Sequence, residues 1–183
     1  MEILEYLANP EIRKDIEPLF ISAFPEEERP NPHYYFSSFK THQDNKLFGF
    51  YDSGVFIGFA SVITYQDFCY IFFLAVSPEH RKQGYGSIIL SELRNMYKDY
   101  VICLCYEEVD KKYPDYELRK KREQFYLRNG FKKNPLMTNE FGVVFQTAYI
   151  GNHLVTFEDY QEIFGKCFGN FAVEHLKDVT KTF

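Results

Sequence analysis

The sequence lacks several features that mark particular classes of protein. No apolar run approaches the roughly 18 residues that a membrane-spanning helix requires, so we expect no membrane protein. A net charge of −5 is the opposite of the basic surface that general nucleic-acid binders usually present. The N-terminal residues show no basic stretch followed by an apolar one, so we also expect no secretory signal. Together these absences predict a cytoplasmic protein that binds neither membranes nor nucleic acids.

Cysteine and histidine are scarce, and neither is spaced as a metal ligand would be. The four cysteines are Cys69, Cys103, Cys105 and Cys167. Cys103 and Cys105 are two residues apart in an apolar run, so in a strand they would share one face and suit core packing. The five histidines include no His-x-x-x-His pair. We therefore expect reduced thiols and no bound metal.

Tryptophan is absent, yet phenylalanine and tyrosine bring the aromatic share to 19%, which favours a sheet-rich core. The chain has 183 residues, of which 45% are hydrophobic and 26% are charged, as is typical of a globular protein. No repeat, low-complexity tract or long linker divides it. We therefore expect a single domain over residues 1–183, with a core at about 47–150 and a helical extension at 152–183.

Apolar spacing predicts helices and strands along the whole chain. Helices are expected at residues 9–23, with Pro18 kinking or dividing the helix, and at 34–42, 85–99, 117–129 and 157–168. Strands are expected at 47–51, 55–65, 70–76, 100–106 and 141–150, the first two joined as a hairpin. The strand, helix and strand between 70 and 106 follow the pattern of a parallel crossover. We therefore expect a mixed α/β (α+β) fold with helices flanking one sheet.

The stretch "LAVSPEHRKQGYGSIIL", Leu74 to Leu90, has the most specific chemistry. It places Gly84 and Gly86 where the end of a strand turns into a helix. Glycine lets the backbone approach a ligand closely. The first amides of a helix lack internal partners and lie at the positive end of its dipole. The sequence therefore predicts an anion site, most often a phosphate site, at this turn.

Two common phosphate motifs do not fit this loop. Its glycines are not followed by the Lys-Ser/Thr pair of a Walker A loop, and Ile89 stands where a dinucleotide fingerprint needs a small residue. The remaining pattern, Arg81-x-x-Gly84-x-Gly86, resembles the acyl-CoA-binding signature of the GNAT N-acetyltransferase superfamily. The later stretch "EQFYLRNGFKK", Glu123 to Lys133, is similar to a second motif of that family, a helix with an aromatic pair that ends at Gly-Phe.

The resemblance implies the GNAT fold, with a central twisted mixed sheet of about six to seven strands and helices on both faces. It also implies acetyl-CoA as co-substrate. Loop amides would hold the CoA pyrophosphate, and strand residues 74–76 would pair with pantetheine and polarise the thioester carbonyl. The residues implied in cofactor binding are Leu74, Ala75, Val76, Arg81, Lys82, Gln83, Gly84, Tyr85, Gly86 and Ser87.

The second motif contains Tyr126, which the resemblance implies as the donor of a proton to the departing thiolate. Many relatives carry a carboxylate base at the start of the strand that precedes the glycine loop. Tyr70 stands about there in this sequence, so the general base is left open. The candidates for the acceptor side are Glu26, Glu27, Tyr70, Glu107 and Glu108.

These motifs predict an N-acetyltransferase that moves acetyl from acetyl-CoA to a primary amine by direct attack in a ternary complex. No suitably placed Cys-His pair indicates a covalent intermediate. The acceptor is left open between a small-molecule amine and the N-terminal or lysine amine of a peptide. A GNAT-fold module that binds acyl-CoA as a sensor is the alternative, followed by a phosphate-binding module for another nucleotide. Whether the chain forms a homodimer is also left open.

Overall fold

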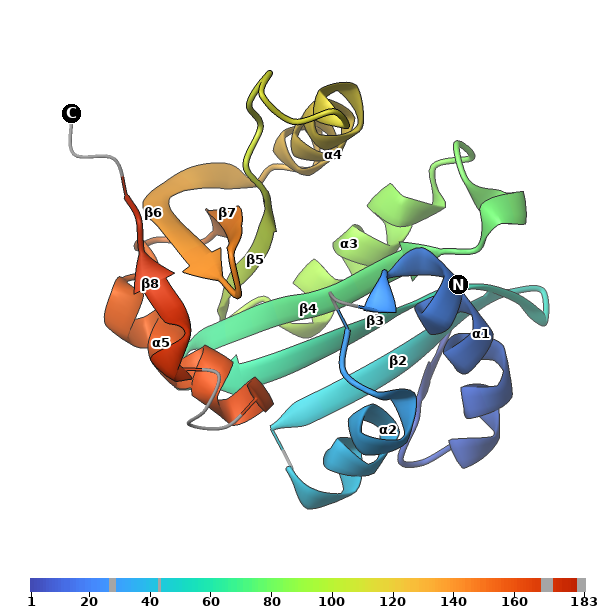
Figure 1. Ribbon diagram of the computed structural model, residues 1–183. Coiled ribbons are helices and arrows are strands. Elements are labelled where there is room, and N and C mark those ends of the chain that lie inside the picture. Colours follow the sequence, from blue (N-terminus) through green and yellow to red (C-terminus); the bar gives the residue numbers. More distant parts are fainter. Residues whose placement is uncertain (27–28, 43, 169–172, 181–183) are drawn as a thin grey trace. The chain divides into compact units, whose positions relative to one another are not determined.

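The computed structural model describes residues 1–26, 29–42, 44–168 and 173–180 (Figure 1). The chain divides into two compact units. Unit 1 comprises Met1–Ile63 and Ile71–Met96, and unit 2 comprises Thr64–Tyr70 and Tyr97–Phe183. No helix of the described residues is both long enough and apolar enough to span a membrane.

Helices and strands follow one another much as the apolar spacing predicts. The strands are β1 (Glu2–Glu5), β2 (Asn45–Asp52), β3 (Val55–Tyr65), β4 (Phe68–Val76), β5 (Val101–Glu107), β6 (Lys132–Glu140), β7 (Val143–Ile150) and β8 (Leu176–Asp178). The helices are α1 (Arg13–Ala23), α2 (Pro32–Thr41), α3 (Tyr85–Met96), α4 (Tyr116–Arg128) and α5 (Phe157–Phe168), with short 3₁₀ turns η1 (Pro10–Ile12) and η3 (Pro78–His80). The strands form one sheet in the order β1-β2-β3-β4-β5-β7-β6-β8. The expected mixed α/β fold is therefore confirmed.

The described residues form eight strands, not the roughly six to seven that the resemblance implies. The apolar spacing does not predict three of them, β1, β6 and β8. β1 and β8 have only four and three residues, too few to show an alternating pattern. β6 contains two lysines and Pro135, and its register with β7 shifts between Lys133 and Met137. Proline is tolerated in a strand at such an irregularity. The expected helical extension therefore also contributes an edge strand, β8.

In unit 1, α1 and α2 cover one face of the strands and α3 lies on the opposite face (Figure 1). The core beneath α1 and α2 is rich in aromatic rings. Phe20 of α1 stacks on Tyr35 of α2 with ring centroids 4.5 Å apart, and it meets Phe73 of β4 edge to face at 5.1 Å. α1 is continuous through Pro18, so of the two expected outcomes, a kink or a division, the division does not occur. We infer that burial of its apolar side offsets the lost backbone hydrogen bond.

A tight turn joins β2 and β3, as predicted. Ser53 and Gly54 have positive φ angles of 51° and 79°, the pattern of a type I′ hairpin turn. The hairpin pairs antiparallel along its length. Asp52 accepts a hydrogen bond of 2.7 Å from the hydroxyl of Tyr85, the first residue of α3. This bond ties the end of the hairpin to the start of α3.

In unit 2, β5 has a helix on each face. It pairs parallel with the first three residues of β4, which confirms the predicted crossover, and antiparallel with β7. Successive side chains of a strand point to opposite faces. Accordingly, Cys105 hydrogen-bonds to Tyr160 of α5, while Tyr106 stacks on Tyr126 of α4. α4 and α5 therefore contact opposite faces of the same strand.

Two local signals place helix ends in unit 2 where they are expected. The hydroxyl of Thr156 accepts from the amide of Asp159 at 3.2 Å, and the Asp159 carboxylate accepts from the amide of Thr156 at 3.0 Å. This capping pair begins α5. Gly130 has a φ of 88° just beyond α4, as a left-handed C-terminal residue does.

β3 and β4 approach each other closely at Gly58. A Cβ atom on Gly58 would lie 2.3 Å from the carbonyl oxygen of Ala75 and 3.1 Å from the Cα atom of Val76. Only a residue without a side chain fits at this position. Directly beyond β4, the amide of Ser77 donates to the carbonyl of Ile57 at 2.8 Å. The close approach therefore sets the position of the carboxyl end of β4.

The variant Gly58→Ala should lower the free energy of unfolding by about 1–3 kcal/mol, because the added methyl group would collide with backbone atoms. Urea denaturation followed by circular dichroism measures this change. Gly165→Ala is the matched control, since its Cβ would meet only a methyl group of Val173 at 3.2 Å. Gly165→Ala should change stability by less than about 1 kcal/mol, because the gain in helix propensity is offset by the tight contact with Val173. Equal stability of Gly58→Ala and the wild type would contradict the close approach.

Candidate active site

The loop between η3 and α3 has left-handed backbone at two positions. Lys82 has a φ of 62° and Gly84 a φ of 88°. The carbonyl of Gly84 accepts from the amides of Ser87 at 3.0 Å and Ile88 at 3.2 Å, which closes the first turn of α3. A Cβ atom on Gly84 would meet nothing within 4 Å. Glycine is therefore needed here for its backbone conformation and not for lack of space.

Five consecutive backbone amides of this loop have no acceptor among the described residues. The amides of Lys82, Gln83, Gly84, Tyr85 and Gly86 make no hydrogen bond of ordinary geometry with the described residues. The last two belong to the first turn of α3, where the helix dipole is positive. This geometry fits an anion such as a diphosphate. The sixth amide of the predicted set, that of Ser87, donates to Gly84 instead.

Two side chains brace the loop from within. The Nε atom of Arg81 donates to the carbonyl of Val76 at 3.0 Å, and the side-chain Nε2 atom of Gln83 donates to the carbonyl of Glu79 at 2.8 Å. The two terminal nitrogens of Arg81 make no hydrogen bond to the described residues. Arg81 therefore fixes the loop to the end of β4 and keeps donors for an anion.

The carboxyl end of β4, residues 74–76, is the second part of the predicted cofactor site. The parallel ladder of β4 with β5 runs from Phe68↔Val101 to Tyr70↔Cys103, so the backbone of 71–76 takes no part in it. At Phe73 the amide donates to the hydroxyl of Ser61 at 3.2 Å. The edge of residues 71–76 that does not pair with β5 can therefore pair with an extended ligand.

Tyr126, the predicted proton donor, lies on α4 against β5. Its ring stacks on Tyr106 with centroids 5.8 Å apart and meets Phe131 edge to face at the same distance. Burial raises the pKa of Tyr126 to about 12, against an opposing effect of the Arg122 guanidinium. The hydroxyl has no hydrogen-bond partner among the described residues. Tyr126 is therefore a protonated phenol at neutral pH whose donor is free for a ligand.

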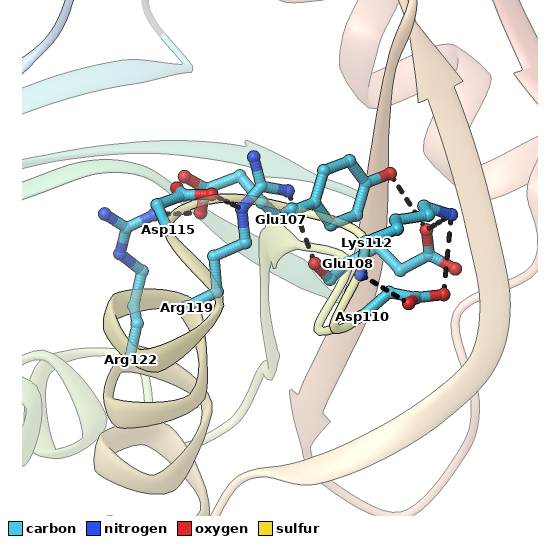
Figure 2. Close-up of polar contacts among 8 residues, drawn as sticks. Glu107, Glu108, Asp110, Lys112, Asp115, Arg119 and Arg122 are labelled. Atoms are coloured by element: carbon cyan, nitrogen blue, oxygen red, sulfur yellow. Dashed lines mark hydrogen bonds and ion pairs between the residues drawn. The ribbon is translucent and has the colours of Figure 1, made fainter.

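Figure 2 shows that the carboxylates at the end of β5 are tied to cations. Glu107 pairs with Arg122 of α4. Glu108 pairs with Lys112 at 2.7 Å and accepts from the hydroxyl of Tyr113 at 3.0 Å. Both glutamates are buried, and buried charges need such partners. An ion pair holds each carboxylate in place and occupies its oxygens, so this geometry favours a structural role for both.

The remaining predicted residues offer no ready base or nucleophile. Glu26 is exposed after α1, and Glu27 lies outside the described residues. Burial raises the pKa of the thiols of Cys69, Cys103 and Cys105, which keeps them protonated. In the described part of the chain, no group of three or more His, Cys, Asp or Glu side chains could hold a metal ion.

The hydroxyl of Tyr70 belongs to a hydrogen-bonded group with Tyr160 and Glu140, two residues that the sequence analysis does not identify. Its hydroxyl oxygen lies 3.1 Å from that of Tyr160 on α5, and Tyr160 donates to Oε1 of Glu140 on β6 at 2.7 Å. Both tyrosines are buried, and Glu140 is half-buried. The sequence offers only one signal, that Tyr160 falls on the apolar side of α5 with Ile163 and Phe164. Sheet pairing and helix packing bring these residues together.

Comparison with known proteins agrees with the loop and the fold. The sequence profile of the acetyltransferase (GNAT) family matches residues 11–131. A search of curated proteins finds no match. Among solved structures, an acetyltransferase from Bacteroides thetaiotaomicron, described as a GNAT family member, has a TM-score of 0.77 at 22% identity. That match covers 94% of this chain and 99% of the other.

Two further structures share this fold and contain CoA groups. An aminoglycoside 6′-N-acetyltransferase complexed with coenzyme A has a TM-score of 0.66 at 19% identity, over 84% of this chain and 99% of the other. Naa50 from Arabidopsis thaliana, in complex with the bisubstrate analogue CoA-Ac-MVNAL, has a TM-score of 0.57 at 16% identity. It covers 83% of this chain and 100% of its own. At these identities the likeness shows a common fold.

The variant Arg122→Met should lower the free energy of unfolding by about 1–3 kcal/mol, because it leaves the buried carboxylate of Glu107 without its cation. Partial exposure of Arg122 keeps the loss below that of a fully buried pair. Chemical denaturation at neutral pH measures the change. Lys121→Met alters the exposed neighbour on the same helix and should change stability by less than about 0.5 kcal/mol. Equal effects of the two variants would show that the ion pair contributes nothing.

Proposed function

This chain belongs to the acetyltransferase (GNAT) family, and from that premise we propose that it transfers acetyl from acetyl-CoA to a primary amine. Acetyl-CoA supplies the acetyl group as an activated thioester. The amine attacks directly in a ternary complex, while the protein binds, orients and handles protons. Cys69 and Cys103 are buried and Cys105 is half-buried, and all three thiols are neutral, which argues against a covalent acetyl-enzyme on any of them.

The row of open amides from Lys82 to Gly86 is the observation that carries this proposal. Oxygens of the CoA pyrophosphate would accept from these amides. The terminal nitrogens of Arg81 and the hydroxyl of Ser87 would add donors. Backbone of residues 74–76 would pair with the pantetheine amides, and one of its N–H groups would donate to the oxygen of the thioester carbonyl as charge develops there.

Tyr126 would donate a hydrogen bond to the departing sulfur. Its pKa of about 12 lies above the ordinary thiol value of about 8.5, so complete transfer of its proton to a thiolate is unfavourable. A hydrogen bond from a neutral phenol still stabilises developing negative charge. Tyr126 therefore serves the leaving group best as a fixed donor that stays protonated.

The acceptor that we propose is an amine of a small molecule or of a peptide N-terminus. Support comes from two proteins of the same fold, an aminoglycoside 6′-N-acetyltransferase and a protein bound to a CoA-Ac-MVNAL analogue. Glu26 and Glu27 stay proposed on the acceptor side, where carboxylates after α1 would attract a cationic amine. Glu107 and Glu108 would support that side through their ion pairs with α4 and its preceding loop.

Acetyl-CoA should raise the melting temperature of the wild-type protein, whereas ATP and NAD should not. Gly84→Val should weaken acetyl-CoA binding by about tenfold or more, because a β-branched residue is strained at a φ of 88° and the amides would diverge. Isothermal titration calorimetry gives both dissociation constants. The matched control is Gly142→Val, which has a φ of 96° and similar open space, but in the β6–β7 turn. If Gly84→Val bound acetyl-CoA as tightly as the wild type, the proposal that these amides bind the pyrophosphate would be wrong.

Tyr126→Phe should lower kcat by about 10²-fold while the dissociation constant of acetyl-CoA stays unchanged, because only the departing sulfur loses a donor. Release of free thiol from acetyl-CoA, with kanamycin, spermidine, lysine and the peptide MVNAL as acceptors, measures turnover. Tyr116→Phe, which removes a hydroxyl from the first residue of the same helix, is the control. Unchanged turnover would remove Tyr126 from the mechanism. Acetyl-CoA binding without thiol release from any acceptor would instead favour a sensor.

A further inference from the structure

A chain of hydrogen bonds in unit 2 ends on a carboxylate that the mechanism above does not use. Tyr160 of α5 is its centre. The oxygen of its hydroxyl lies 3.1 Å from that of Tyr70, 3.2 Å from the sulfur of Cys105 and 2.7 Å from Oε1 of Glu140. Thr138 also donates to Oε1 of Glu140, at 2.8 Å. Four secondary-structure elements, β4, β5, β6 and α5, therefore meet at one phenol.

The donors in this chain have a single consistent direction. A tyrosine hydroxyl has one proton to donate and can accept two hydrogen bonds. A carboxylate only accepts, so Tyr160 gives its proton to Glu140. Cys105 donates its thiol proton to Tyr160. The remaining acceptor position on Tyr160 then suits the hydroxyl of Tyr70. Every proton in the chain therefore points toward Glu140.

Glu140 differs from three other glutamates of unit 2 because no cation pairs with it among the described residues. Glu107, Glu108 and Glu123 pair with Arg122, Lys112 and Lys133, respectively. The groups that face Glu140 are neutral: Tyr160 from α5, Cys105 from β5, Tyr70 from β4 and Thr138 on its own strand. Across the sheet it pairs with Leu176, next to His175, whose ring stacks on Phe141.

A carboxylate in such surroundings binds a proton readily. Burial raises the pKa of Glu140 above its ordinary value, although its hydrogen bonds from Tyr160 and Thr138 act in the opposite direction. A base is most effective when its pKa lies closer to the working pH than that of an ordinary glutamate. The surroundings therefore suit Glu140 to accept a proton during a reaction.

Tyr70 is the residue of this chain that lies on β4, the strand of the proposed cofactor site. Tyr70 is the last β4 residue in the ladder with β5, and β4 continues from it toward residues 74–76. Tyr160 also contacts Cys105, whereas Tyr126 stacks on Tyr106, so the chain lies on the opposite face of β5 from Tyr126. A donor to the leaving sulfur and an acceptor for the amine proton would then not compete for the same space.

We propose that Glu140 takes up the proton that the acceptor amine loses, through Tyr160 and Tyr70; this rests on the acetyltransferase function proposed above. One N–H bond of the amine breaks as its nitrogen forms the new bond to the acetyl carbon. The oxygen of Tyr70 takes that proton and passes its own to Tyr160, which passes its own to Glu140. Both phenols end neutral, and the carboxylate ends as a carboxylic acid. Tyr70 would touch the amine, and Tyr160 and Glu140 act through it.

Glu140→Gln should lower kcat/KM by about 10²-fold at neutral pH, with acetyl-CoA binding unchanged. The assay is thiol release with the fastest acceptor of the panel above, followed across pH. Wild-type activity should fall as the pH drops through the raised pKa of Glu140, because the carboxylate becomes protonated. Glu140→Gln should not show this fall in activity as the pH drops. Its loss of kcat/KM relative to the wild type should become smaller at high pH, where the amine loses its proton to solvent. A merely structural role would not change the pH profile in this way.

Tyr160→Phe is the second variant, since it keeps the carboxylate but interrupts the chain, and it should show a similar loss of kcat/KM. Glu162→Gln changes an exposed carboxylate on the same helix and should behave as the wild type. Melting temperature and acetyl-CoA affinity report whether each variant is folded. Wild-type rates and pH profiles in folded Glu140→Gln or Tyr160→Phe would overturn the inference and leave the proposed function standing. Failure of the wild-type protein to bind acetyl-CoA, or to release thiol with any acceptor, would overturn both.

Discussion

The start of α3 depends on left-handed backbone at Lys82 and Gly84. That conformation turns the chain from the end of β4 into the helix and leaves five successive backbone amides with no acceptor in the described part of the chain. Proteins seldom leave buried amides unpaired, but this loop is exposed, so a ligand can take the place of an internal partner. Hydrogen bonds from Arg81 and Gln83 to backbone carbonyls hold the loop in that shape. The proposed place of acetyl-CoA follows from these few torsion angles.

Three glutamates of unit 2, Glu107, Glu108 and Glu140, differ in the charge of their partners. Glu107 and Glu108 each contact a cation and link β5 to α4 and its preceding loop, which stabilises the surroundings of Tyr126 (Figure 2). Glu140 has only neutral partners, and burial without a cation strengthens its hold on a proton. The same residue type is therefore structural where it contacts α4 and its preceding loop and, as we propose, a proton acceptor where it contacts α5.

Much of the fold could be predicted because the signals are local. The type I′ turn at Ser53 and Gly54, the capping pair of α5 and Gly130 after α4 each depend on residues close in the chain. β6 was not predicted because its lysines and Pro135 interrupt the alternating apolar pattern of a strand. It is identified as a strand by its pairing with β7 and β8. α1 likewise tolerates Pro18 because it packs on an aromatic core that no local pattern shows.

The sequence by itself determined the glycine loop, the helix that contains Tyr126 and the family, since each is a pattern of neighbouring residues. The tertiary structure alone decided which carboxylates pair with cations and which does not. It also placed the hydroxyl of Tyr70 beside that of Tyr160, 90 residues away in the chain. Burial and hydrogen-bond partners control how strongly a side chain binds a proton, and both arise only when distant strands and helices pack together.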